Sequence, residues 1–119
     1  MKKVLMVFIA LTLFLVPLTA IAGEGPMKLA AGANAEVNKH NEEGIAEWDK
    51  EDYAAALMHF SAASKIDHGI GETHFNEAIC LDKLGKHGDA TMHFKAAKKN
   101  AKGNAAILNS PILNGHIGG

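Results

Sequence analysis

The chain contains no arginine and its charges nearly cancel, which argues against a nucleic-acid partner. Twelve lysines oppose thirteen acidic residues, giving a formal net charge of −1 at pH 7. Proteins that bind DNA or RNA usually present a basic surface, with arginine side chains that grip phosphates and guanine. We therefore expect no binding to nucleic acid.

Cysteine is nearly absent as well. Cys80 stands alone, so no disulfide can form within the chain and packing must hold the fold together. Its neighbours Ile79 and Leu81 belong to a helical apolar pattern, which favours a buried, small hydrophobic side chain at position 80. A reactive or intermolecular thiol is the alternative interpretation.

The sequence also lacks the short motifs of common catalytic and cofactor sites. It contains no Gly-x-Ser-x-Gly, no His-Glu-x-x-His, no phosphate-binding loop and no Cys-x-x-Cys-His. These motifs supply, respectively, a nucleophile, a zinc site, a phosphate cradle and a haem attachment point. We therefore expect a protein that is not an enzyme and has no cofactor.

Residues 1–22 have the pattern of a bacterial export signal. A positively charged start precedes the uncharged apolar run Val4–Val16, and Ala20 and Ala22 supply small residues for signal peptidase. The run is short for a membrane span, which needs about 20 apolar residues. We expect cleavage, a periplasmic or secreted protein and no stable membrane anchor afterwards, with an uncleaved N-terminal anchor as the alternative.

The rest of the chain divides by composition and by apolar spacing. Residues 23–35 are rich in Gly and Ala and predict a flexible leader. A helical domain is expected over 36–109, and a tail over 110–119. Apolar residues three and four apart, bounded by turn residues, predict helices over 36–49, 53–66, 72–84 and 87–100, and a short fifth helix over 105–109 that Pro111 stops.

The helical region repeats itself after 34 residues. Residues 58–65 recur as 92–99, and aligning 37–70 with 71–104 gives 11 identical pairs. The identities include His40 with His74 and Glu43 with Glu77. A repeat of this length is typical of a helix–turn–helix unit that buries its apolar face only against a neighbouring unit.

Small and aromatic residues recur within each unit. In this respect residues 37–104 resemble the tetratricopeptide repeat family. The resemblance implies an all-α fold of two stacked helix–turn–helix repeats, with a short C-terminal capping helix or tail. The residues that carry it are Gly44, Tyr53, Ala56, Phe60 and Ala63 in the first unit, and Ala78, His87, Ala90, Phe94 and Ala97 in the second.

Two departures from the family stand out. His40 and His74 occupy a position where the family prefers tryptophan or another large apolar residue. Such folds also need about three units for stability, whereas this chain has two and a fragment. Either the apolar tail covers the exposed end, or a second copy stacks there and forms a homodimer.

The resemblance implies a groove, lined by the first helix of each unit, that binds a peptide or protein segment. The leading hypothesis is a non-catalytic adaptor or scaffold of the bacterial cell envelope, with an unidentified protein partner. Trp48 and Phe75 can instead pack inside the core. The expected partner-binding residues are Asn38, Asn41, Ile45, Trp48, Phe75, Asn76, Ile79 and Lys83.

A second hypothesis rests on the repeated His-x-x-Glu. His40 with Glu43, and His74 with Glu77, each place an imidazole and a carboxylate one turn apart on a helix. Such a pair offers two ligands to zinc or another transition metal, where a site needs three or four. The alternative function is therefore a periplasmic metal-binding protein; His59 and His93 are expected to face solvent.

Overall fold

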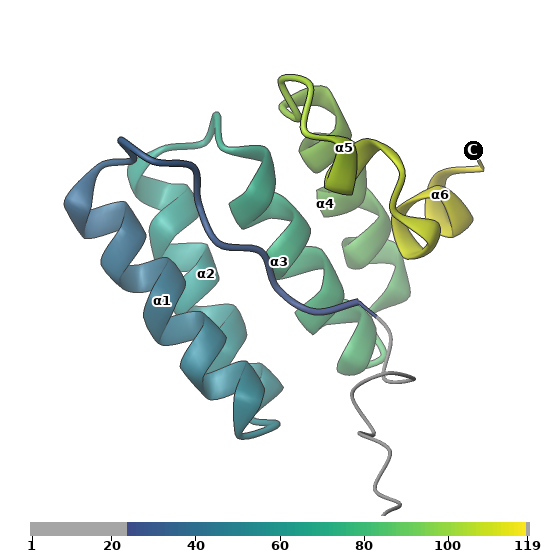
Figure 1. The fold of residues 1–119 in the computed structure, drawn as a ribbon. Helices are drawn as coiled ribbons and strands as arrows, with labels where there is room; N and C mark the ends of the chain where they lie inside the picture. Colours follow the sequence, from purple (N-terminus) through teal and green to yellow (C-terminus); the bar gives the residue numbers. More distant parts are fainter. Residues whose placement is uncertain (1–23, 119) are drawn as a thin grey trace, which may run out of the picture.

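The computed structural model describes residues 24–118, and this part of the chain contains six helices (Figure 1). The expected export signal, residues 1–22, lies outside this part. None of the described helices is both long enough and apolar enough to cross a membrane. The helices are α1 (Ala35–Asp49), α2 (Tyr53–Ile66), α3 (Gly71–Lys83), α4 (His87–Lys99), α5 (Ala105–Leu108) and α6 (Pro111–Ile117).

Side-chain caps set several of the helix starts. The Asn34 side chain accepts hydrogen bonds from the Glu36 and Val37 amides at the start of α1. Asp52, expected as a cap, accepts from the Ala55 amide at 3.0 Å and begins α2. These bonds satisfy N–H groups that have no partner within the helix.

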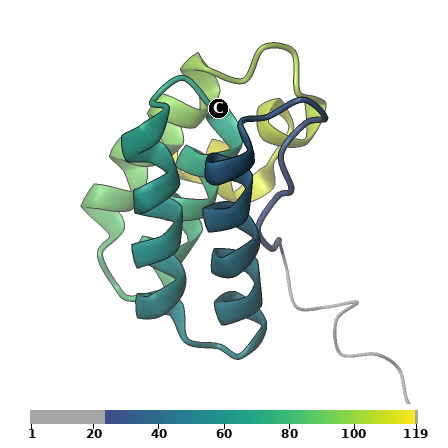
Figure 2. The same cartoon turned by 90° about the vertical axis from the view of Figure 1, so that its left-hand side faces the viewer.

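The helices pack as two stacked hairpins, α1 with α2 and α3 with α4, and α2 joins them by packing against α3 (Figures 1 and 2). Phe75 and Phe94 meet edge to face in the core, with ring centroids 5.6 Å apart. The expected all-α arrangement of two stacked helix pairs is confirmed. The fully buried alanines that let the helices approach one another are Ala56, Ala63, Ala90 and Ala97.

The C-terminal tail covers the open side of the second hairpin. Helices α5 and α6 pack against α4, and Ile107 and Leu113 are fully buried. Pro111 occupies the first turn of α6, where a missing N–H costs nothing. The C-terminal segment therefore supplies cover at this end, which is one of the two alternatives that the sequence left open.

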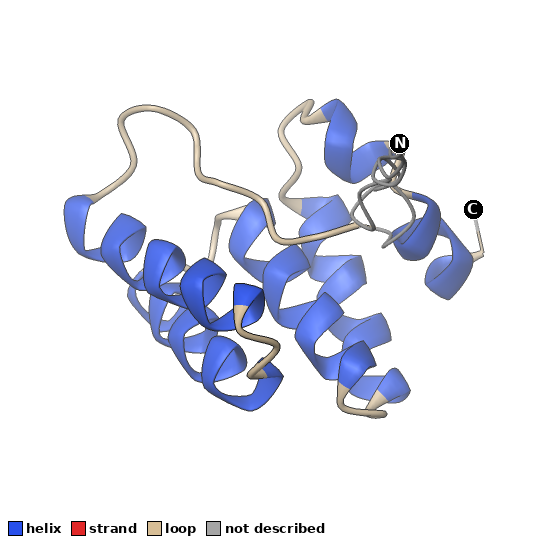
Figure 3. Cartoon of the chain, turned by 60° about the horizontal axis from the view of Figure 1, so that its bottom comes forward, coloured by secondary structure: helices blue, strands red, loops and turns tan. Residues whose placement is uncertain are grey.

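The leader is not a free segment in the structure. Residues 24–34 cross α1 and α3 on the face opposite α2 and α4 and lead toward α6 (Figures 1 and 3). The Met27 N–H donates to Asn76 Oδ1 at 2.7 Å, and the Met27 carbonyl accepts from the amides of Asn41 (3.0 Å) and Asn76 (2.9 Å). The Ile112 N–H donates to the Glu24 carboxylate at 2.9 Å. The flexible leader expected from composition is instead docked, because two buried amides satisfy its main chain.

One glycine is required by the packing of the first hairpin. A Cβ at Gly44 would lie 2.5 Å from Phe60 Cε1, and the Phe60 ring is fully buried. We expect Gly44→Ala to lower the free energy of unfolding by about 1–3 kcal/mol through overpacking. Urea denaturation followed by circular dichroism measures this change.

Gly88 is the matched control, since it also lies in a helix but a Cβ there would meet nothing within 4 Å. Gly88→Ala should leave the free energy of unfolding unchanged or raise it by up to about 1 kcal/mol. Equal losses in the two variants would contradict the close approach of Gly44 to Phe60.

Candidate metal centres

Histidines and carboxylates gather in three groups within residues 24–118. Two of the groups are related by the 34-residue repeat, and the third joins the tail to the second hairpin. We call them the first-repeat cluster, the second-repeat cluster and the cap cluster. Their members are, in that order, His40, Glu43 and His59; His74, Glu77 and His93; and Asp82, His87 and His116.

Each repeat cluster is assembled from both helices of its hairpin. The first helix contributes the His-x-x-Glu pair that the sequence indicated, and the second helix contributes a further histidine, His59 or His93. These two were expected to face solvent beside the core, and their side chains are 33% and 34% exposed, so that expectation is correct only in part. They are half-buried, and each points its Nδ1 atom at the carboxylate of the pair. The sequence did contain a signal for these two histidines, because the 34-residue offset that relates His40 to His74 also relates His59 to His93.

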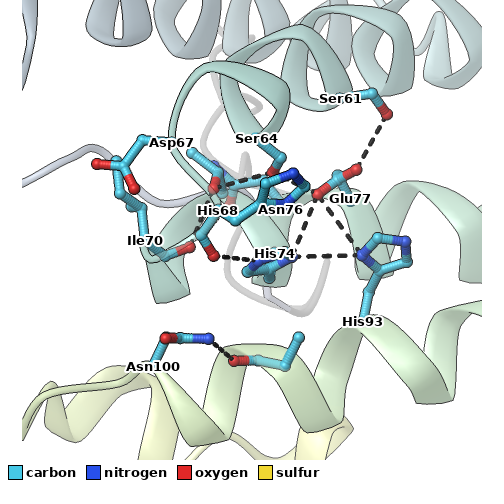
Figure 4. Close-up of polar contacts among 12 residues, drawn as sticks. Ser61, Ser64, Asp67, His68, Ile70, His74, Asn76, Glu77, His93 and Asn100 are labelled. Atoms are coloured by element: carbon cyan, nitrogen blue, oxygen red, sulfur yellow. Dashed lines mark hydrogen bonds and ion pairs between the residues drawn. The ribbon is translucent and has the colours of Figure 1, made fainter.

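The second-repeat cluster is an equilateral triangle of ligand atoms (Figure 4). His74 Nδ1, His93 Nδ1 and Glu77 Oε2 lie 3.5 Å from one another in all three pairs. Good N–H···O hydrogen bonds are shorter, at about 2.7–3.2 Å. Ligands 3.5 Å apart around a tetrahedral ion imply metal–ligand bonds of about 2.1 Å, the length found for zinc with nitrogen and oxygen ligands.

A backbone contact holds the His74 ring in the orientation that a metal ligand needs. His74 Nε2 lies 2.8 Å from the His68 carbonyl, which can only accept a hydrogen bond, so Nε2 carries the proton. In the neutral ring the lone pair is then on Nδ1, which faces Glu77 and His93. Histidines that bind metals commonly use this kind of second hydrogen bond to fix ring and tautomer.

Glu77 is a buried carboxylate on α3 that side chains from α2, α3 and α4 contact. It is 4% exposed, and the hydroxyls of Ser64 and Ser61 on α2 donate to its two oxygens at 2.6 and 3.0 Å. Burial raises the pKa of Glu77, but the bonds from His74 and Ser64, the charge of His93 and the Ser61 bond together hold the pKa below its usual value. The carboxylate is thus an anion, and its position demands a neighbouring cation.

His74 can supply that cation by binding a proton. The Glu77 carboxylate, 3.5 Å from Nδ1, raises the pKa of His74 and outweighs burial, which lowers it; the His68 carbonyl adds to the rise. Two states therefore satisfy the buried carboxylate, a protonated imidazole or a metal ion bound by all three residues. Protons and metal ions compete for the same lone pairs.

The first-repeat cluster has the same members in a more open setting. Glu43 Oε1 lies 3.6 Å from His40 Nδ1 and 3.4 Å from His59 Nδ1. The His40 nitrogen is buried without a hydrogen-bond partner among the described residues. Buried polar atoms are almost always paired, so this nitrogen has an unused lone pair or proton aimed at the cluster.

The cap cluster is different, because its distances are those of hydrogen bonds. Asp82 Oδ1 accepts from His87 Nδ1 at 2.5 Å and from His116 Nε2 at 2.9 Å. Thr91 Oγ1 lies 2.8 Å from His116 Nδ1. The polar atoms are satisfied by one another, and the network ties α6 to α3 and α4.

The residues expected to bind a partner have several different environments. Asn41 and Asn76 are fully buried and bind the chain's own leader. Phe75 and Ile79 belong to the core, so for Phe75 the core alternative is correct. Trp48 is half-buried against Tyr53, at 4.8 Å between ring centroids. Of the others, Asn38 and Ile45 are half-buried, and Lys83 is exposed with its Nζ 5.9 Å from the Trp48 ring centroid.

Cys80 belongs to none of the clusters. It is fully buried beside Phe60 and Ala56, as the apolar pattern indicated. Burial, with a smaller effect of the Glu77 charge, raises the pKa of the thiol to about 12. A thiol in this state is neither a ready nucleophile nor a ready metal ligand.

Comparisons with known proteins add no assignment, since no protein-family model, curated protein or solved structure matches the chain. The tetratricopeptide resemblance therefore stays a prediction from the sequence, while the stacked helix pairs are a property of the structure.

The docked leader gives a test of the contacts around Met27. Asn76→Ala removes two of the three side-chain hydrogen bonds to the Met27 main chain, leaving the one from Asn41, and also removes the bond between Asn76 and Asn41. We expect the free energy of leader opening to fall by about 1–3 kcal/mol. Trypsin should then cut faster after Lys28, which is exposed in this segment; mass spectrometry of the fragments measures the rate.

Asn38→Ala is the control, because Asn38 lies about one turn before Asn41 on α1 and makes none of the bonds to Met27. It should be cut after Lys28 at the wild-type rate. If Asn76→Ala is also cut at that rate, Asn76 does not hold the leader.

Proposed function

We propose that this is an exported protein that binds a transition-metal ion at each repeat cluster, most tightly at the second. The observation that carries the proposal is the triangle of His74 Nδ1, His93 Nδ1 and Glu77 Oε2, with all three sides 3.5 Å long. Two imidazoles and one carboxylate form a ligand set that holds zinc and other transition metals in proteins.

The contrast with the cap cluster supports a metal ion over an ordinary polar network. In the cap cluster a carboxylate and two histidines approach to 2.5 and 2.9 Å and hydrogen-bond directly. In the repeat clusters the same residue types stay 3.4–3.6 Å apart while still pointing at a common centre. Room for an ion between the ligands accounts for that difference.

Repetition is the second support. All three residue types recur at the 34-residue offset, although the first cluster is half-exposed and the second has its His74 and Glu77 buried. Different surroundings with the same three side chains favour a shared binding role over a local packing requirement.

The number of ligands indicates what such a site does. Structural zinc sites have four protein ligands, whereas a site with three leaves a position open to water or to another ligand. Beside Glu77 and His93 lies a cavity of about 180 Å³, which a further carboxylate, that of Asp89, also lines. Together with the expected export signal, an open site favours buffering or transfer of metal ions outside the cytoplasm.

Calorimetric titration of the full mature chain, without an affinity tag, with zinc tests the proposal. We expect saturable binding of two ions by the wild type, and of one ion by His93→Gln or by His59→Gln. Each variant loses one of three ligands, and even loss of a residue that only orients a ligand costs about 10–100-fold in affinity.

His87→Gln is the matched control, since His87 belongs to the hydrogen-bonded cap cluster. It should bind as many ions as the wild type. Absence of saturable binding to the wild type would end the metal-binding proposal, and loss of an ion in His87→Gln would move the site to the cap.

Binding of a protein or peptide segment is a second candidate function. The observation that favours it is the leader itself, an extended segment held by main-chain hydrogen bonds from Asn41 and Asn76. The same two amides would recognise the main chain of another extended peptide, as expected for the groove. In the wild type the leader competes for this surface, so a partner must displace it.

A variant lacking residues 24–30 tests this second function with a synthetic peptide of the same sequence. We expect saturable binding reported by Trp48 fluorescence, because Gly25 lies against the Trp48 indole in the intact chain. The variant that also carries Asn76→Ala should bind the peptide at least several-fold more weakly. No saturable signal in the leader-deleted variant would exclude trans binding of such peptides.

A further inference from the structure

Trp48 and Lys83, two of the residues expected to bind a partner, belong to none of the three clusters. Together with Tyr53 they meet where α1 ends, α2 begins and α3 ends. The rings of Trp48 and Tyr53, which we call the aromatic corner, lie edge to face with centroids 4.8 Å apart. Lys83 Nζ lies 5.9 Å from the Trp48 centroid and 5.6 Å from that of Tyr53. Aromatic rings attract an ammonium at such distances, so the corner already holds an alkylammonium that the chain itself supplies.

Two cavities border the aromatic corner. One has a volume of about 370 Å³ and an apolar wall that includes Ile79 and Ile112, and the other has about 220 Å³ and includes both rings. Trp48 and Lys83 line both cavities. Lys83 is exposed and its stem is flexible, so its ammonium can move out and join the two cavities into one. Small-molecule sites have volumes of about 300–1,000 Å³.

The walls of the two cavities are acidic. Apart from Lys83, every charged side chain that lines them is a carboxylate, namely Glu24, Asp49, Glu51 and Asp82. Asp82 already accepts hydrogen bonds from the cap cluster. Within residues 24–118, neither Lys83 nor the other three carboxylates have an ion-pair partner within 4.0 Å. The negative charge therefore exceeds the single ammonium, and such a cleft attracts cations.

The form of the site favours an organic cation over a metal ion. Glu24, Asp49 and Glu51 do not bring three ligand atoms within 4.8 Å of one another, as the clusters do. Aromatic faces attract ammonium groups, whereas metal ions bind oxygen, nitrogen or sulfur atoms. The apolar wall at Ile79 and Ile112 suits methylene groups. A cation that matches these features carries several ammonium groups joined by methylene chains.

We propose that the aromatic corner and its two cavities bind a linear aliphatic polyamine, which displaces the Lys83 ammonium. One ammonium of the ligand lies over the two rings, and the methylene chain follows the wall at Ile79 and Ile112. A further ammonium faces the Glu24 carboxylate, which lines both cavities. This function goes beyond the proposed binding of metal ions and does not depend on it, since Trp48 and Tyr53 belong to none of the clusters.

Titration of the mature chain with spermidine tests the proposal. The buffer contains 0.15 M salt, which screens distant charges, and EDTA, which keeps the metal clusters empty. Trp48 is the only tryptophan, so its fluorescence reports on the corner. We expect a saturable change in the wild type. Lys83→Gln removes the internal competitor and should bind spermidine about two- to fivefold more tightly, which corresponds to the strength of an exposed cation–π contact.

Lys86→Gln is the matched control, because it makes the same change of charge at an exposed lysine that lines neither cavity. It should bind spermidine as the wild type does. Tyr53→Leu removes one ring and should weaken binding about two- to fivefold, with circular dichroism to verify its fold. Butylamine, which has a single ammonium, should bind more weakly than spermidine, and Mg²⁺ should give no saturable change.

Two results would overturn the polyamine site. One is the absence of a saturable change with spermidine in both the wild type and Lys83→Gln. The other is an affinity of Lys83→Gln no higher than that of Lys86→Gln, which would mean that the Lys83 ammonium does not occupy the ligand's position. Neither result bears on the metal clusters, and failure of the zinc titration would leave the polyamine site intact.

Discussion

The buried carboxylate of Glu77 is the interaction on which the centre of this protein depends. It accepts hydrogen bonds from α2, lies one turn from His74 on α3 and faces His93 on α4. Three helices thus converge on one negative charge that is nearly cut off from water. Such a charge requires compensation, either by a proton on the facing imidazoles or by a metal ion among them.

The two repeats place the same three residue types in different solvent environments. In the first hairpin the cluster lies on the outer side and remains half-exposed, while in the second α2 covers it with two serine hydroxyls. A repeat fold creates this difference automatically, because only the inner unit has a neighbour that packs over its first helix. The inner cluster is therefore the more strongly preorganised of the two, and preorganised ligands bind more tightly.

The leader and the tail supply what a third repeat would otherwise provide. The tail covers the second hairpin with α5 and α6, and the leader lies across α1 and α3 and reaches α6 through Glu24. Asn41 and Asn76 also bind one another at 2.8 Å. The surface expected to receive a partner thus already holds an extended segment, which is the reason that metal binding and peptide binding are separate proposals with separate tests.

Helices α1 to α5 could be predicted from the sequence, because the spacing of alanines and phenylalanines and the 34-residue offset are local periodic signals; α6 lies in the expected tail, outside the repeat, and was not predicted. The sequence also indicated His40, Glu43, His74 and Glu77, since a pair one turn apart lies on one helix. That His59 and His93 complete the clusters is visible in the folded structure, because their approach depends on how two helices are rotated against each other. The docking of the leader could not be predicted from its Gly- and Ala-rich composition either. The side-chain amides that bind its main chain lie 14 and 49 residues further along the chain.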